Sequence, residues 1–308
     1  MFNPQPQANL SQSSQSADTR SSSLKQLPQN KAQRDWLAQL RLTFGARQEK
    51  TILLENTHCG PLSVQRPFYP EDNGCCHTYL LHPPGGMAPG DRVHFDIAVN
   101  QHSHALLTTP AAGKIYRTDT AKHLQQQLLH ADIGDQACLE WLPQETIVFT
   151  GANARIHNRF CLRGNAKLIA WDIVCLGRRA SNELFDQGHC EQLIEVEDNG
   201  RLVLRERNLW SGGAALMSAP WGMANYSVAG TLMATFTSNR HQLDDWRHHL
   251  TSADIAGEWG ITQKSSLFIA RYLGQSAQAC RRGFELLWQH LRPAMLKYSH
   301  CRPRIWNT

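Results

Sequence analysis

Two carboxylates lie within a short apolar stretch, and their types and spacing allow several kinds of chemistry. Residues 138–149 read CLEWLPQETIVF, and Glu140 and Glu145 are the charged side chains in it. Opposed carboxylates can serve as acid and base in a hydrolase, hold a metal ion, neutralise buried arginines or belong to a surface that a partner covers. A separation of five residues points them to opposite faces of a strand unless Pro143 introduces a bulge, which weakens the hydrolase interpretation.

A third carboxylate, Asp172, is surrounded by apolar residues in AKLIAWDIVCLG (166–177). An isolated buried carboxylate is unfavourable by several kcal/mol or has its pKa shifted upward. We therefore expect an arginine to pair with it, and the candidates are Arg155, Arg178 and Arg179. The alternative is that Asp172 is a polar residue lining an internal passage.

The fifteen histidines raise the possibility of a metal site. His58, His189 and His300 each precede a cysteine, but adjacent residues on a strand point to opposite sides and make a poor chelate. His102 and His104 share a face if they lie on a strand, and such a pair can bind a borderline ion such as nickel, zinc or copper. A solvated or core histidine is the more common role for each of these side chains.

Common nucleotide-binding and hydrolase motifs are missing from the chain. The sequence contains no GxxxxGK[ST], HExxH, GxSxG or GxGxxG. We therefore predict that the chain does not hydrolyse GTP or ATP with a phosphate loop. A hydrolase that uses paired carboxylates needs none of these motifs and is the alternative function.

Strands are the elements that must position these side chains. RVHFDIAV (92–99) alternates apolar with polar residues, and ARIHNRFCL (154–162) places Ile156, Phe160 and Leu162 on one face. Turn signals separate such segments at intervals of about one strand each. We predict a mainly β fold, an elongated stack of strands that is either β-helix-like or sandwich-like, with a few helices.

Helical signal is confined to a few segments. The strongest is 276–292, near the C-terminus, where apolar residues recur at three- and four-residue spacing and Pro293 is expected to end the helix. Residues 241–250 are polar and compatible with a helix. Residues 121–131 fit a short helix or a single turn, with a strand as the alternative.

The domain organisation follows from composition. Residues 1–35 are rich in Gln and Ser and contain few apolar side chains, so we predict a disordered tail there. A short amphipathic segment is expected around residues 35–42, and the strand pattern begins at Thr51. We predict a single domain over residues 40–302.

Charge and cysteine usage limit the partners and the compartment. The formal net charge of +5 is concentrated at the two ends of the chain, without the clustered basic face and motif support of a nucleic-acid binder. No stretch approaches the roughly 18 apolar residues of a membrane span, and the N-terminus has no apolar signal core. Nine cysteines without a CxxC pair indicate reduced thiols. We predict a cytoplasmic protein with neither nucleic-acid nor membrane partners.

Five longer motifs occur in order along the chain. They are GPLSVQRPFYPE (60–71), LHPPGG (81–86) followed by GD (90–91), LLTTPAAGKIYR (106–117), LEWLPQETIVF (139–149) and WDIVCLGRRASNELFDQG (171–188). This ordered set resembles the urease accessory protein family UreD, called UreH in some bacteria, from about Leu40 to about Arg302. Asn182 stands where the family pattern has Gly, and Asn tolerates the left-handed backbone that such a turn needs.

The resemblance implies a urease maturation factor and not an enzyme. It implies a nickel metallochaperone scaffold that binds apo-urease, a UreF-type accessory protein and a UreG-type GTPase, with no tightly bound cofactor and nickel only in transit. A relay needs ligands that release the ion, and carboxylates exchange readily. We therefore expect Glu140, Asp172 and Glu183 to line a transient nickel path. The alternatives are that these carboxylates neutralise Arg117 or Arg178, or that the chain is a docking scaffold that no metal crosses.

Overall fold

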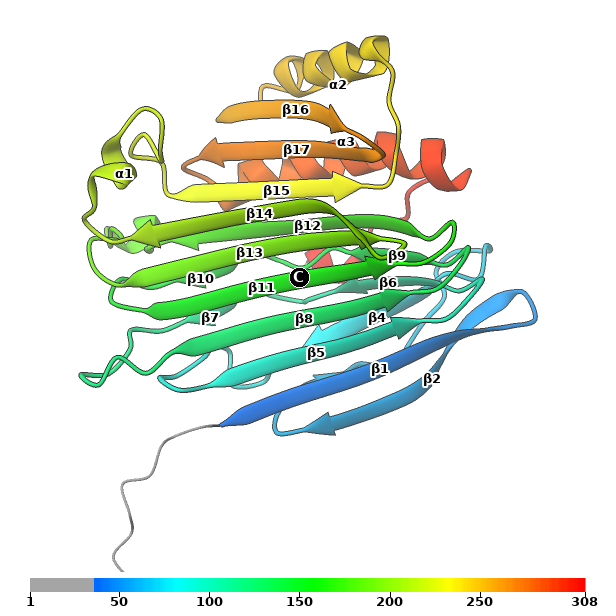
Figure 1. The fold of residues 1–308 in the computed structure, drawn as a ribbon, viewed down its shortest axis with the longest axis horizontal. Coiled ribbons are helices and arrows are strands. Elements are labelled where there is room, and N and C mark those ends of the chain that lie inside the picture. Colours follow the sequence, from blue (N-terminus) through cyan, green and yellow to red (C-terminus); the bar gives the residue numbers. More distant parts are fainter. Residues whose placement is uncertain (1–35, 308) are drawn as a thin grey trace, which may run out of the picture. The chain divides into compact units, whose positions relative to one another are not determined.

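Two β-sheets make up most of the molecule in the computed structural model, which describes residues 36–307 (Figure 1). The predicted tail over residues 1–35 lies outside the described residues. One sheet has seven strands, in the order β14 (Arg201–Ser211), β13 (His189–Asp198), β11 (Asn153–Leu162), β8 (Gln125–Ile133), β5 (Arg92–Val99), β1 (Leu37–Arg47) and β2 (Lys50–Cys59).

The other sheet has ten strands. Eight of them follow in the order β16 (Glu258–Lys264), β17 (Leu267–Gly274), β15 (Val228–Ala234), β12 (Lys167–Leu176), β9 (Cys138–Trp141), β6 (His104–Thr108), β4 (Cys76–Leu81) and β3 (Ser63–Val64). The remaining two are β10 (Thr146–Val148), which pairs with β12, and β7 (Gly113–Ile115), which pairs with β10.

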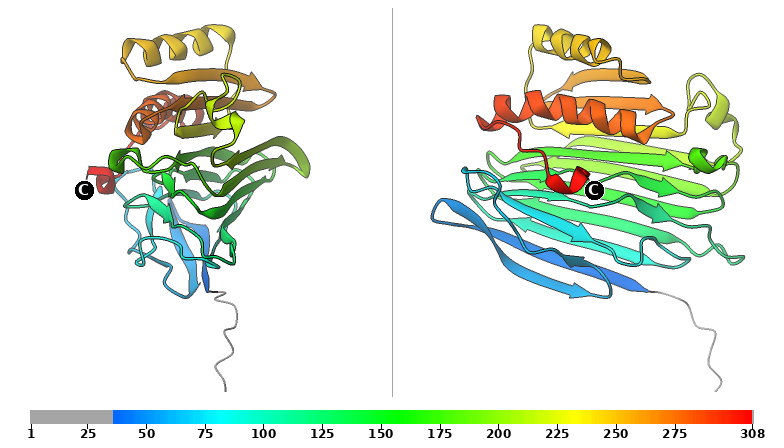
Figure 2. Two further views of the ribbon diagram at one scale, coloured as in Figure 1. Left: turned by 90° about the vertical axis from the view of Figure 1, so that its left-hand side faces the viewer. Right: turned by 180° about the vertical axis from the view of Figure 1, so that it is seen from behind.

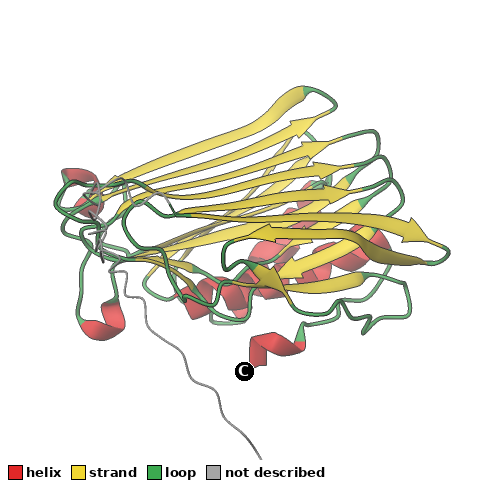
Figure 3. Cartoon of the chain, turned by 90° about the horizontal axis from the view of Figure 1, so that it is seen from below, coloured by secondary structure: helices red, strands yellow, loops and turns green. Residues whose placement is uncertain are grey.

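The chain alternates between the two sheets through its middle, from β4 to β13. Strands β5, β8, β11 and β13 are parallel neighbours in the seven-stranded sheet, and β4, β6, β9 and β12 are parallel neighbours in the ten-stranded sheet. Parallel neighbours need a crossover, which the strand of the opposite sheet supplies here. This winding is β-helix-like, while the two facing sheets are sandwich-like (Figure 3). The predicted mainly β fold is confirmed.

The main apolar core lies between the sheets and follows from the two-residue period of the strands. In β1 the inward residues are Ala38, Leu40, Leu42 and Phe44, all with at most 1% exposure. The amphipathic segment expected before Thr51 is therefore a strand, and the strand pattern begins earlier than predicted.

The helices of residues 36–307 are α1 (Ala215–Ser218), α2 (Arg240–Ser252) and α3 (Ala277–Leu296), with short 3-10 turns at Arg179–Ser181 and Arg304–Asn307. Helix α1 packs against β14 at the edge of the seven-stranded sheet, whereas α2 and α3 pack against strands of the ten-stranded sheet. A second apolar cluster, which includes Trp171, Phe284 and Trp288, joins α3 to the ten-stranded sheet. Seen from behind, α3 lies across strands of that sheet (Figure 2). The layers are therefore sheet, sheet and helix.

The helix predictions had mixed outcomes. The helices over 241–250 and 276–292 are confirmed as α2 and α3. The short helix predicted for 121–131 is wrong, and the alternative of a strand is confirmed, because Gln125–Ile133 form β8, which pairs with strands on both sides. No helix among residues 36–307 is long and apolar enough to span a membrane.

Pro293 does not end α3, contrary to the prediction. The helix continues to Leu296 and is capped by Lys297 in the left-handed region at φ 66°, whose N–H donates to the Pro293 carbonyl. A proline removes one backbone donor, but Met295 and Leu296 are buried in the helix-side core. Packing of this last turn outweighs the missing hydrogen bond.

Candidate functional site

A buried cluster of charged side chains lies between α3 and the ten-stranded sheet. Glu140 is on β9, and His104, on the neighbouring strand β6, lies opposite Cys138. Leu139 and Trp141, on either side of Glu140, belong to the core between the sheets. Because side chains alternate along a strand, Glu140 points the other way, toward the helix.

Four contacts hold the Glu140 carboxylate. The Nε atom of Arg292 donates to Oε1 at 2.9 Å and to Oε2 at 3.2 Å. Trp288 Nε1 donates to Oε2 at 2.6 Å, and His104 Nε2 lies 2.7 Å from Oε1. The guanidinium of Arg292 also binds Glu71, at 2.7 and 2.8 Å. Glu140 and Arg292 are fully buried, so both oxygens of Glu140 are occupied by protein donors inside the molecule.

The charges of this cluster are balanced within it. Burial raises the pKa of Glu140, but Arg292, His104 and Trp288 lower it by a larger amount, and the resulting pKa is about 2. Burial lowers the pKa of His104, but the adjacent sulfurs of Cys75 and Cys138 raise it, and the net pKa is well above its usual value. The cluster therefore places the Glu140 carboxylate between the His104 imidazole and the Arg292 guanidinium.

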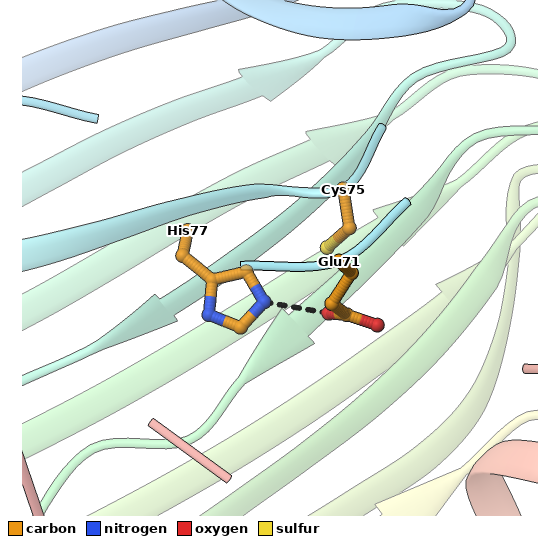
Figure 4. Close-up of side chains that lie close together, drawn as sticks. All are labelled: Glu71, Cys75 and His77. Atoms are coloured by element: carbon orange, nitrogen blue, oxygen red, sulfur yellow. Dashed lines mark hydrogen bonds and ion pairs between the residues drawn. The ribbon is translucent and has the colours of Figure 1, made fainter. Parts of the chain in front are cut away.

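A group of three potential metal ligands extends the cluster. The ligand atoms of Glu71, Cys75 and His77 lie within 4.8 Å of one another, and Figure 4 shows the three side chains pointing toward one another. His77 Nε2 lies 2.6 Å from Glu71 Oε1. Its Nδ1 atom is buried and has no hydrogen-bond partner among the described residues. Depending on the tautomer of His77, this buried nitrogen can still donate or accept one hydrogen bond.

A second such group consists of Cys75, His104 and Glu140. Thiolate, imidazole and carboxylate together suit borderline divalent ions such as zinc or nickel. His104 also lines a surface pocket of about 460 Å³, together with His102 and Cys138. The structure therefore gives this group an approach from solvent. A metal would have to displace the proton of Cys75, whose pKa is raised to about 11, chiefly by burial.

Asp172 lies in the other layer, between the two sheets. Asn158 Nδ2 and Gln192 Nε2 donate to its Oδ2 atom at 2.8 and 2.9 Å. Burial raises its pKa to about 6, although these hydrogen bonds oppose the shift. The predicted arginine partner is wrong: Arg155 pairs with Glu191, and the other two candidates bind residues outside this layer. Amides hold this carboxylate without neutralising it.

Glu183 follows a short turn near the surface. Arg178 donates to it at 2.5 and 3.1 Å, and the Thr150 N–H donates at 3.1 Å. The hydrogen bond from Arg178 is the main reason that the pKa of Glu183 is lowered. Asn182 adopts left-handed geometry with φ 55°, as predicted for a position where the family pattern has Gly.

The structure does not bring the three predicted carboxylates together. Glu140 pairs with Ile169 on β12, so Asp172, three residues further on, points to the opposite face of the sheet. Glu183 lies in a third place, beyond the end of β12. The buried partner of Glu140 is Arg292, and neither Arg117 nor Arg178 fills that role.

Sequence reasoning missed the residues that complete the Glu140 cluster, above all Arg292 and Glu71. Arg292 is one position beyond Leu291 and four beyond Trp288, on the buried stripe of α3. A charged residue on an apolar stripe needs a buried counter-charge, and that signal was available. Nothing local indicated that Glu71 and Glu140 would be its partners.

Comparisons with known proteins agree with one another. The chain matches the family described as UreD urease accessory protein over residues 37–307. It is 43% identical over 277 residues to a urease accessory protein UreD of Saccharophagus degradans, covering 89% of this chain and 94% of that protein. Proteins of the same name from Nitrosococcus oceani and Dechloromonas aromatica are each 42% identical, with 89% of this chain and 90% and 95% of the relatives covered.

Proposed function

The chain belongs to the UreD family of urease accessory proteins, and we propose that within urease maturation it supports the insertion of nickel into the enzyme. The observation that carries the proposal is the family match over residues 37–307, nearly all of the described chain. The contacts of Glu140 argue against the hydrolase alternative. This carboxylate is bound by an arginine, a tryptophan and a histidine and is therefore not free to act in an acid/base pair. In this proposal nickel is cargo in transit, and the chain holds no resident cofactor.

We propose that a UreF-type accessory protein, a UreG-type GTPase and apo-urease are its partners. The chain has no phosphate loop, so any GTP hydrolysis in the assembly has to come from another subunit. The nine cysteines all lie in the described residues and none forms a disulfide, in keeping with a cytoplasmic assembly.

An apolar groove supports the partner part of the proposal. It has a volume of about 530 Å³ and lies against β14, β15 and β17. Trp221, Leu209 and Leu216 line it with exposures of 85%, 49% and 42%. A group of exposed apolar side chains on one part of a surface is typical of a site that binds another protein.

Oxygen and amide groups connect this groove to Asp172 in the interior. Gln192 binds Asp172, and Asn208 Nδ2 donates to Gln192 Oε1 at 2.9 Å. Gln192 and Asn208 both line the groove. The Oδ1 atom of Asn158 is buried beside Asp172 and has no hydrogen-bond partner within residues 36–307. These are weakly held, hard ligands of the kind that a relay for a divalent ion requires, and they favour Asp172 as part of the nickel path.

Glu140 and Glu183 enter the proposed path in different ways. Glu140 contributes through the group with Cys75 and His104, which is reached from the 460 Å³ pocket. Glu183 is held by Arg178, so a passing ion has to compete with that guanidinium. We propose Asp172 as the most available of the three ligands, because its side-chain partners among residues 36–307 are amides and not cations.

The test is urease activation in cells that express urease and its accessory genes but lack this gene. Wild-type chain should restore urease activity and nickel content. The variants Asp172→Asn and Glu183→Gln keep volume and hydrogen bonding but remove the negative charge. Each should leave the complex recoverable by pull-down while lowering nickel in purified urease. Failure of wild-type chain to restore activity would contradict the maturation role, and normal nickel loading with both variants would contradict the path alone.

A further inference from the structure

Three potential metal ligands lie together on the outward face of the seven-stranded sheet, away from the clusters described above. His130 and Asp132 are two residues apart on β8 and share a face, and Cys161 lies opposite Asp132 on β11. Their ligand atoms all lie within 4.8 Å of one another. We propose that His130, Asp132 and Cys161 form a separate binding site for a borderline divalent cation, of the class of zinc, nickel and cobalt.

The distances between the donor atoms fit such an ion. Cys161 Sγ lies 3.7 Å from His130 Nε2, and that nitrogen lies 3.8 Å from Asp132 Oδ2. In a tetrahedral zinc site with bonds of about 2.0–2.3 Å, neighbouring donor atoms are about 3.3–3.6 Å apart. Closing the remaining few tenths of an ångström needs only small side-chain rotations. A thiolate, an imidazole and a carboxylate also form the mixed donor set that these ions prefer.

The strands on both sides leave room for the ion. On β5 the residue in register with Asp132 is Ala98, whose methyl group leaves space for water ligands. On β13 the residue in register with Cys161 is Glu197, a carboxylate within reach of the site. Three protein ligands with an open position is the arrangement of metal sites that exchange ligands.

The neighbouring arginines are already engaged. Arg159 donates to Glu197 at 2.9 Å and also interacts with the sulfur of Cys161, and Arg163 lies 3.4 Å from the Oδ1 atom of Asp132. The contact from Arg163 orients the carboxylate and leaves its Oδ2 atom facing His130, as partners in an outer coordination shell do. Arg163 therefore orients a ligand of the site, whereas an ion that binds Cys161 has to displace Arg159 from its sulfur.

The site is accessible from solvent. The side chains of His130 and Asp132 are 49% and 43% exposed. Within residues 36–307, α2 and α3 pack against strands of the ten-stranded sheet and leave the outward face of β8 and β11 uncovered. Cys161 is the least exposed ligand, and burial raises the pKa of its thiol, so binding of an ion there would release a proton.

The experiment is a cobalt titration of the purified full chain without a histidine tag. Cobalt bound to a thiolate has a charge-transfer absorption that imidazole and carboxylate ligands do not produce. Cys161→Ser should remove one cobalt equivalent of this absorption. His130→Ala should lower the affinity for cobalt by about 10- to 100-fold or more, since even the loss of an outer-shell partner has that effect. Zinc added to the cobalt-loaded chain should displace the cobalt.

Two matched variants control for other ligands. Cys59→Ser removes an exposed thiol on β2, and His157→Ala removes a histidine on the same outward face that lies 2.9 Å from Glu195. Both should bind cobalt as wild-type chain does. Equal absorption and stoichiometry for wild type, Cys161→Ser and Cys59→Ser would overturn the proposal. Circular dichroism of each variant checks folding, and because the readout is metal binding to the isolated chain, its outcome is independent of urease activation.

Discussion

Arg292 on α3 and Glu140 on β9 form an ion pair in which neither side chain has any exposed surface, with Nε and Oε1 2.9 Å apart. A charge removed from water is stabilised only by close partners, and this pair has them in Glu71, His104 and Trp288. The pair therefore ties the C-terminal helix to the centre of the ten-stranded sheet.

Replacement of Glu140 by Gln should lower the free energy of unfolding by about 3–5 kcal/mol, because it leaves Arg292 buried without a full counter-charge. Urea denaturation at neutral pH measures this difference. Glu145→Gln is the control within the same motif, since this carboxylate is only partly buried, and it should unfold like wild type. Equal stability of Glu140→Gln and wild type would contradict a structural role for the pair.

The same carboxylate should make the protein sensitive to acid. The pKa of Glu140 is lowered to about 2 in the folded chain, against about 4.3 in an unfolded one. Its contribution to stability is therefore fully present above about pH 4.3 and is lost as the pH falls toward 2. Unfolding curves between these limits should have a smaller acid dependence in Glu140→Gln.

Asp172→Asn should have the opposite effect on stability. The folded pKa of Asp172 is raised to about 6, so the wild-type fold loses stability as the pH rises from about 4 to 6. A shift of about two units corresponds to about 3 kcal/mol. Asn can still accept the hydrogen bonds from Asn158 and Gln192. The variant should therefore be more stable at pH 7 and lack this slope. A less stable variant would show that the ionised form is favoured by the fold.

Glu183→Gln should change stability by about 1 kcal/mol or less, because its partner Arg178 is well exposed. The side chain of Arg178 is 42% exposed, and Gln can keep the hydrogen bond from the Thr150 N–H. Thermal unfolding measures the effect. A large loss of stability would mean that this ion pair organises the surrounding turn, and the nickel measurement on this variant would then report folding.

Trp306→Ala should lower the free energy of unfolding by about 3–5 kcal/mol, as expected for a large side chain removed from a core. Trp306 is 6% exposed, and its Nε1 donates to Thr108 at 2.8 Å. Its ring packs against Trp171 and Trp288. Denaturant unfolding provides the measurement, and an unchanged midpoint would show that the C-terminal segment is dispensable for the fold.

Trp221→Ala removes a tryptophan from the surface, in contrast to the buried Trp306. Because this side chain is 85% exposed, its removal should leave stability within about 0.5 kcal/mol of wild type. If the groove is a partner surface, the variant should recover less UreF-type partner in a pull-down. Undiminished recovery would direct the search for the partner surface to another face of the molecule.

The sequence by itself determined the elements whose signal is local. The alternation in residues 92–99 predicted β5, and the spacing of apolar residues predicted α3, because side-chain direction within one strand or helix depends only on neighbours a few positions away. The ordered motifs from residue 60 to residue 188 were sufficient to indicate the family. Asn182 was likewise explained by the backbone geometry of a single residue.

Tertiary structure decided the partners of the buried charges Glu140, Asp172 and Arg292. Arg292 and Glu140 are 152 positions apart in the chain, and their contact depends on how α3 lies across the ten-stranded sheet. Asp172 was expected to bind an arginine, but the register of β11 and β13 brings amides to it instead. Residues 125–131 are a strand because pairing partners on both sides outweigh a weak local helical preference. Long-range packing selects such contacts, and no pattern within a short stretch of sequence specifies them.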